Sequence, residues 1–94
     1  MNRITVTDSD GSYSVSDDDF DIAIHRLGLF EDAIVDLLTS AEKIPSELEA
    51  MRFQGKEKTV RYKETIARKL IFNNIMAFFE RHGLIKEFEQ DDNE

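Results

Sequence analysis

Residues 4–15 alternate apolar and polar side chains on both sides of the dipeptide Asp10-Gly11. A period of two is typical of strands. Asp-Gly is favoured in two-residue hairpin turns, because both positions of a type I′ turn need positive φ. The pattern predicts a short N-terminal β-hairpin in which Val6 pairs with Val15. A flexible arm rich in serine and aspartate is the alternative.

From Phe20 onward, apolar residues recur at intervals of three and four. Ser16 and the three aspartates that follow it supply an N-cap and a negative first turn, both of which favour the start of a helix. The apolar stripe consists of Phe20, Ala23, Ile24, Leu27, Phe30, Ile34, Leu37 and Leu38. The spacing predicts an amphipathic helix that runs to about Thr39, with residues 39–45 as a connection.

Two further helices are expected after this connection. Pro45 suits the first turn of a short helix over residues 45–54, and Gly55 would end that helix. A long last helix is expected over residues 56–82, with Gly83 as the residue that follows its end. The predicted fold is therefore mainly α: a short N-terminal β-hairpin followed by a three-helix arrangement with a long C-terminal helix.

The predicted last helix carries apolar residues on two faces. Its main stripe consists of Val60, Ala67, Ile71, Asn74 and Phe78, widened by Ile66, Leu70 and Ile75. Phe72, Met76 and Phe79 lie near the opposite side. A helix that is apolar all round is normally buried all round, and one small domain can barely surround it. We predict a homodimer, with burial within the chain beneath the β-hairpin as the alternative. The expected interface consists of Phe72, Ile75, Met76 and Phe79.

Composition places the chain among small single domains, with 94 residues, 40% of them hydrophobic, and no cysteine. We expect one domain over residues 1–94: a hairpin or flexible arm (1–16), a helical core (17–83) and an acidic tail (84–94). The lack of cysteine excludes a disulfide framework, a thiolate metal site and a cysteine nucleophile. The longest apolar run, residues 70–79, is too short to cross a membrane, so a cytoplasmic protein without membrane contact is expected.

Two acidic clusters only partly resemble metal sites. Aligned on Gly11, residues 6–17 resemble a calcium loop, but Val6 occupies the position of the first ligand. Asp18, Asp21 and His25 share one face of the first helix, where acids are favoured by the helix dipole alone. The chain contains no nucleophile elbow, no phosphate-binding loop and no HExxH sequence. We therefore expect no catalytic residue, no metal, no cofactor and no enzymatic activity.

Charge is unevenly distributed along this chain of net charge −8. Residues 51–79 hold seven basic and two acidic residues, whereas residues 1–50 hold three basic and twelve acidic ones. The helix–glycine–helix order around Gly55 has a weak likeness to a helix-turn-helix. Candidate contacts to nucleic acid are Lys56, Lys58, Arg61, Arg68 and Lys69. The favoured alternative is that these cations pair with the acidic first helix.

The segments "RLGLFEDA" and "QGKEKTVRYKETIARKLIFNNIMAFFERHGL" resemble small proteins of phages, prophages and mobile elements of Gram-positive bacteria. The resemblance covers residues 26–84. It implies an accessory protein in the bacterial cytoplasm and assigns no activity to any residue. The sequence thus predicts a non-enzymatic interaction or regulatory protein, with a protein partner besides a second copy of itself. A nucleic-acid-binding module is one alternative, and an acidic inhibitor that caps a host protein or mimics nucleic acid is another. The candidate surface of that inhibitor consists of Asp17 to Asp21, Glu31, Asp32 and Asp36.

Overall fold

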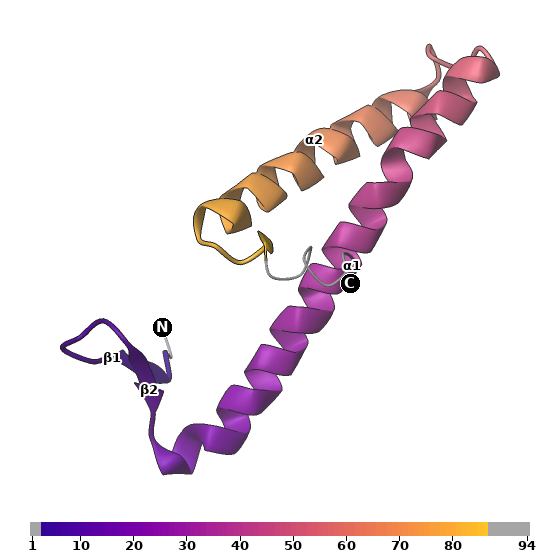
Figure 1. Ribbon diagram of the computed structural model, residues 1–94. Helices are drawn as coiled ribbons and strands as arrows, with labels where there is room; N and C mark the ends of the chain where they lie inside the picture. Colours follow the sequence, from indigo (N-terminus) through magenta and orange to yellow (C-terminus); the bar gives the residue numbers. More distant parts are fainter. Residues whose placement is uncertain (1–2, 87–94) are drawn as a thin grey trace, which may run out of the picture. The chain divides into compact units, whose positions relative to one another are not determined.

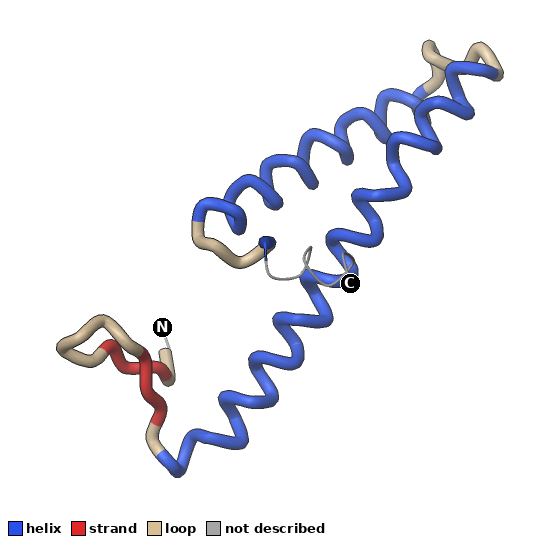
Figure 2. The backbone as a smooth tube through the Cα atoms, in the orientation of Figure 1, coloured by secondary structure: helices blue, strands red, loops and turns tan. Residues whose placement is uncertain are grey.

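The structure, a computed structural model, describes residues 3–86. Its elements are two strands, β1 (Thr5–Thr7) and β2 (Tyr13–Val15), one turn of 3-10 helix (Asp17–Asp19), and two helices, α1 (Phe20–Phe53) and α2 (Val60–Arg81) (Figures 1 and 2). The chain divides into two compact units, one up to Ala33 and one from Ile34 onward. The boundary therefore falls inside α1. The sequence had separated a hairpin from a helical core at residue 16.

The mainly helical character and the N-terminal β-hairpin are confirmed, but the predicted three-helix arrangement with a long C-terminal helix is wrong. Apart from the single 3-10 turn, the described residues form two helices, and the longer one comes first. α1 has 34 residues and α2 has 22. Residues 39–45, the predicted connection, are helical, and Pro45 lies inside α1. The first two predicted helices are thus one helix.

α1 continues through Pro45 because its apolar stripe does. Ala41 and Ile44 carry the spacing of three and four from the first predicted helix to Leu48, and Ile44 and Leu48 are each only 1% exposed. A proline inside a helix removes one backbone hydrogen bond and crowds the carbonyl four residues earlier, at a cost of about 3 kcal/mol. Burial of a large aliphatic side chain contributes about 1.5–3 kcal/mol, so these two together offset that cost.

Both helices end at glycines, as predicted. Gly55 and Gly83 have φ values of 69° and 75°, in the left-handed region that residues with a Cβ avoid. After α1, the N–H of Lys56 donates to the carbonyl of Met51 at 2.9 Å, and the N–H of Gly55 donates to the carbonyl of Arg52 at 3.0 Å. The same two bonds close the end of α2 at Gly83. These are Schellman motifs, which satisfy the last carbonyls of each helix.

β1 and β2 pair antiparallel, but the predicted pairing of Val6 with Val15 is wrong by one residue. The pairs are Thr5 with Val15, Val6 with Ser14, and Thr7 with Tyr13. A two-residue type I′ turn needs positive φ at both Asp10 and Gly11, and only Gly11 has it. The loop therefore has three residues, closed by a bond from the N–H of Asp8 to the carbonyl of Ser12 at 2.7 Å.

The side chain of Asp10 stabilises this longer loop. Its carboxylate accepts hydrogen bonds from the Ser12 hydroxyl at 2.7 Å and from the Ser12 N–H at 3.0 Å. An aspartate bonded to the backbone two residues ahead forms an Asx turn. These bonds, first the one from the hydroxyl and then the one from the backbone, lower the pKa of Asp10 below its ordinary value of 3.8.

Acidification is expected to weaken the β-hairpin. Because the pKa of Asp10 is lower in the folded hairpin than in the unfolded chain, the ionised carboxylate stabilises the hairpin above the unfolded pKa. This contribution disappears as the pH falls from about 3.8 through the lower folded value. Cross-strand NMR contacts between β1 and β2, followed as a function of pH, measure the effect. Asp10→Asn keeps an acceptor oxygen without the charge. If the hairpin of this variant weakened with falling pH as the wild type does, the loss of stability would not come from Asp10.

The most deeply buried side chains of the described residues lie in the second unit. They are Ile34, Ile44 and Leu48 of α1, Thr65 of α2, and Ile85, which follows α2. After α2 the chain turns back toward α1 (Figure 1). Ile85 is 0% exposed there, although the sequence placed it in the acidic tail over residues 84–94. The remainder of that predicted tail, residues 87–94, lies outside the described residues.

Candidate interaction surface

In the second unit, the part of α1 from Ile34 onward and α2 form a helical hairpin. Near the turn between the helices, Arg52 of α1 donates from Nε to the hydroxyl of Tyr62 at 2.9 Å. Farther along, Arg68 of α2 forms an ion pair with Glu47 of α1 at 2.8 Å. Thr59 caps the start of α2, where its hydroxyl accepts a hydrogen bond from the N–H of Tyr62 at 3.2 Å. These contacts determine which side of α2 faces its own chain.

One side of α2, the inner face, is covered within the chain. The inner face consists of the buried or half-buried residues Tyr62, Thr65, Ile66, Lys69, Phe72, Met76 and Phe79. At its centre, Thr65 is 4% exposed, and its hydroxyl donates to the carbonyl of Arg61 at 2.9 Å. This internal bond lets a polar side chain occupy a buried position without an unsatisfied group.

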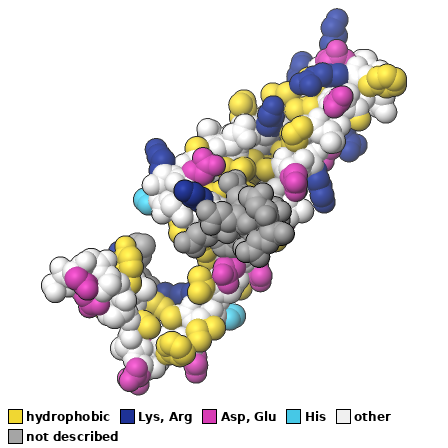
Figure 3. Space-filling view, in the orientation of Figure 1, with side chains coloured by type: hydrophobic (Ala, Val, Ile, Leu, Met, Phe, Trp, Pro, Cys, Tyr) yellow, Lys and Arg dark blue, Asp and Glu magenta, His cyan; other side chains and the backbone are white. Residues whose placement is uncertain are grey.

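The other side of α2, the outer face, is apolar and exposed. The outer face consists of Val60, Leu70, Ile71, Ile75 and Phe78. Ile71 is 56% exposed and Phe78 is 50% exposed. The ring of Phe78 lies 5.4 Å from the guanidinium of Arg81 and has ring contacts with Phe79 and His82. Half of the side chain nevertheless stays exposed. Hydrophobic side chains lie among the charged ones on the visible surface of the hairpin (Figure 3).

The two faces of α2 are exchanged relative to the sequence prediction. The stripe expected to pack inward, around Val60, Ile71 and Phe78, is the exposed outer face. Of the predicted dimer interface, Phe72, Met76 and Phe79 are half-buried on the inner face and Ile75 is exposed. Burial within the chain, the alternative that the sequence left open, therefore accounts for the first three residues. The β-hairpin, which that alternative expected to cover them, belongs to the other compact unit.

The predicted basic cluster is split by the structure. Arg68 pairs with Glu47, and Lys69 is half-buried on the inner face. Glu47 lies in the segment that the sequence assigned to a separate short helix, so the expected pairing of the basic helix with the acidic helix before residue 39 stays a prediction. Lys56, Lys58 and Arg61 are exposed.

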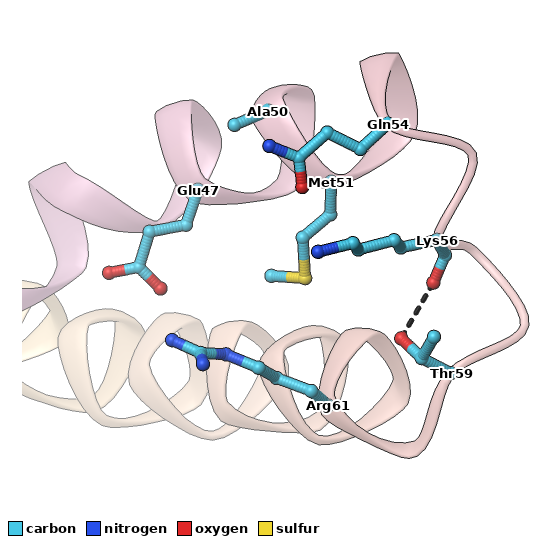
Figure 4. A pocket seen from close by; sticks show the side chains of 7 residues that line it. All are labelled: Glu47, Ala50, Met51, Gln54, Lys56, Thr59 and Arg61. Carbon is cyan, nitrogen blue, oxygen red and sulfur yellow. Dashed lines mark hydrogen bonds between the residues drawn. The ribbon is translucent and has the colours of Figure 1, made fainter.

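A groove of about 500 Å³ lies beside the turn between α1 and α2. Its lining residues are Glu47, Ala50, Met51, Gln54, Lys56, Thr59 and Arg61. Figure 4 shows the side chains of Met51 and Lys56 extending between the two helices, with Glu47 and Arg61 across from one another farther along. The lining offers two cations, Lys56 and Arg61, and one carboxylate, Glu47.

The first unit carries a second exposed apolar surface, on the N-terminal part of α1. Phe20, Ile24 and Leu27 lie on one side of the helix and are 56%, 55% and 56% exposed. Ile22 and Leu29 lie near the opposite side and are also exposed. Acidic residues flank these side chains at Asp17, Asp18, Asp19, Asp21, Glu31 and Asp32. All of them are exposed except Asp19, which is half-buried.

The acidic clusters that the sequence singled out are not assembled into metal sites. Within residues 3–86, no group of three His, Cys, Asp or Glu side chains is placed to hold a metal ion. Asp18, Asp21 and His25 therefore remain separate exposed residues. Asp8 and Asp10 accept hydrogen bonds from Ser12 within the hairpin loop instead.

No protein-family model, curated protein or solved structure matches this chain. Neither helix of the described part combines the length and the apolar character that crossing a membrane requires.

Proposed function

We propose that the protein is a small, non-enzymatic interaction protein of the cytoplasm that self-associates as a homodimer through the outer face of α2. The observation that carries this proposal is the exposure of Val60, Ile71 and Phe78 on one side of a helix whose other side already packs within the chain. Contiguous exposed apolar surface bordered by polar residues marks sites of protein interaction. The likeness of residues 26–84 to accessory proteins of mobile elements agrees with such a role.

The spacing along the outer face supports a helix as the covering element. Ala67 and Asn74 lie on the same side of α2 as Val60, Ile71 and Phe78, and from Ala67 to Phe78 these residues follow one another at intervals of four, three and four. Glu64 occupies the corresponding position between Val60 and Ala67. The spacing from Ala67 to Phe78 is the a/d pattern of a helix that packs against another helix. A single asparagine within such a pattern favours one pairing over others, at some cost in stability. Nucleic-acid binding and inhibition of a host protein stay predictions from the sequence.

Sedimentation equilibrium tests the proposal. The wild-type protein is expected to sediment at twice its protomer mass of 10.9 kDa. Ile71→Glu/Phe78→Glu is expected to raise the dissociation constant by at least about 100-fold, because each change places a charge in an apolar contact. Asn73→Glu is the matched control, since it adds a charge to an exposed position of α2 on another side of the helix. Far-UV circular dichroism checks that all three proteins keep their helices.

A monomeric wild type at about 1 mM protomer would contradict self-association, because a dimer with any useful affinity is populated there. A dimer that survives in Ile71→Glu/Phe78→Glu would move the interface away from the outer face. Dissociation of the Asn73→Glu control to the same extent would show that charge alone, rather than the outer face, determines assembly.

A further inference from the structure

We infer that the outer face of α2 is covered by the N-terminal part of α1, residues 20–33, from a second copy of the chain, and that two copies exchange this contact reciprocally. This inference rests on the proposed self-association and adds the identity of the covering segment. Self-association and the reciprocal contact between α1 and α2 can fail separately in a complementation experiment.

The first support is a match in apolar spacing. On α1, Phe20, Ile24 and Leu27 follow one another at intervals of four and three. On α2, Ile71, Ile75 and Phe78 have the same intervals. All six are exposed in the single chain. Side chains with this spacing lie on one side of a helix and interdigitate with those of a second helix.

The second support is charge. Residues 17–33 contain six acidic residues and one arginine, whereas α2 contains five basic and two acidic residues. Two α2 helices placed against each other would bring like charges together. An acidic α1 segment against α2 brings opposite charges together. Electrostatic complementarity of this kind selects the partner more than it adds affinity.

The third support is where these charges lie relative to the apolar residues. Asp17–Asp19 precede Phe20, and Glu31 and Asp32 follow Leu27. On α2, basic residues likewise stand at both ends of the apolar set. Arg68 precedes it, and Arg81 follows it. The acidic ends of one segment therefore meet basic residues of the other whether the two helices pair parallel or antiparallel. Arg68 is already bonded to Glu47 but keeps 49% of its side chain exposed, so it can also face a partner.

The covering segment comes from another molecule because the inner face of α2 already packs against its own hairpin, which leaves the outer face pointing away from it. Each copy carries one acidic apolar segment and one basic apolar face. Two copies therefore use all four surfaces in a closed, symmetric dimer. The contact then occurs twice, which doubles the buried area toward the 1,200–2,000 Å², roughly, of a stable interface.

A complementation experiment tests the reciprocal contact. One variant, Ile71→Glu/Phe78→Glu, lacks the α2 surface, and a second, Ile24→Lys/Leu27→Lys, lacks the α1 surface. Each alone is expected to be monomeric, with a dissociation constant at least about 100-fold higher than that of the wild type. An equimolar mixture is expected to form a one-to-one heterodimer in sedimentation, because one of the two contacts is intact. Ile22→Lys/Leu29→Lys, on another side of α1, is the matched control and stays dimeric.

The outcomes separate the two proposals. If the α2 variant is monomeric while the α1 variant remains a dimer, α2 pairs with α2: self-association stands and the reciprocal contact is overturned. Failure of the mixture to associate also overturns the reciprocal contact. A monomeric wild type overturns both.

The salt dependence of the wild-type dimer is an independent measurement that needs no variant. Contacts between opposite charges weaken as salt screens them, whereas contacts between like charges are relieved. The dissociation constant is therefore expected to rise about tenfold between about 50 and about 500 mM NaCl. A constant that falls over this range would identify pairing between like-charged α2 helices and would overturn the inference.

Discussion

Ile85→Ala is expected to lower the free energy of unfolding of the helical hairpin by about 2–5 kcal/mol. Ile85 is 0% exposed, so the substitution removes one methylene and two methyl groups from a fully buried side chain and leaves a cavity. Small domains have a net stability of about 5–15 kcal/mol, so this loss is a large part of the total. The residue lies beyond the end of α2, where the chain turns back after Gly83. Its burial makes that short segment part of the core.

Urea denaturation followed by circular dichroism measures the effect, with all proteins at one protomer concentration because dimerisation contributes to apparent stability. Leu84→Ala is the neighbouring control. Leu84 is 37% exposed, so its truncation removes the same kind of side chain from a site that is only partly covered. The control is expected to lose clearly less stability than Ile85→Ala. Equal losses in the two variants would contradict the burial of Ile85 within the hairpin.

The ends of the helices could be predicted from the sequence because the signals there are local. A glycine after a helix reaches the left-handed conformation at little cost, and the Schellman bonds at Gly55 and Gly83 involve residues that are close in the chain. The β-hairpin could be predicted for the same reason. The register of the strands could not be predicted, since it depends on whether the loop has two residues or three. The bonds from Ser12 to the Asp10 carboxylate stabilise the three-residue loop.

The number of helices could not be predicted from the same local rules. Proline at position 45 is a valid first residue of a helix, and its local cost argues against a helix interior. Whether the helix continues through Pro45 is decided by the burial of apolar side chains before and after this proline. Ile44 and Leu48 reach the core only if the helix before Pro45 and the helix after it share one axis. That gain depends on α2 and Ile85, which are distant in sequence.

Which face of α2 packs within the chain could not be predicted for a different reason. Both of its faces carry large apolar side chains, so apolar periodicity cannot rank them. The inner face even contains Thr65 and Lys69, which argue against burial when judged by residue type. Thr65 is accommodated by a bond to the carbonyl four residues before it, and contacts from Arg52 and Glu47 orient the helix. The two contacts with α1 require the helical hairpin to be formed, whereas the Thr65 bond lies within α2.

Phe72→Ala is expected to lower the stability of the monomer, whereas Phe78→Ala is expected to weaken the dimer, although the two phenylalanines lie only six residues apart on one helix. Phe72 is half-buried on the inner face, beside Ser40 and Lys43 of α1. Its truncation is expected to lower the free energy of unfolding of the dilute monomer by about 2–4 kcal/mol. Phe78 is 50% exposed, so its truncation costs the monomer clearly less. Because Phe78 is the largest side chain of the outer face, its loss is instead expected to raise the dimer dissociation constant about 10–100-fold.

Denaturation of dilute samples and sedimentation of concentrated ones measure these two quantities separately. Each variant is the control for the other. Both replace phenylalanine by alanine in α2, so the change in helix propensity is the same in the two proteins. If Phe72→Ala disrupts the dimer and leaves the monomer as stable as the wild type, the interface lies on the inner face. Phe72, Met76 and Phe79 would then pack against a second copy. If only Phe78→Ala weakens assembly, the inner face belongs to the fold of each chain and the outer face belongs to the dimer.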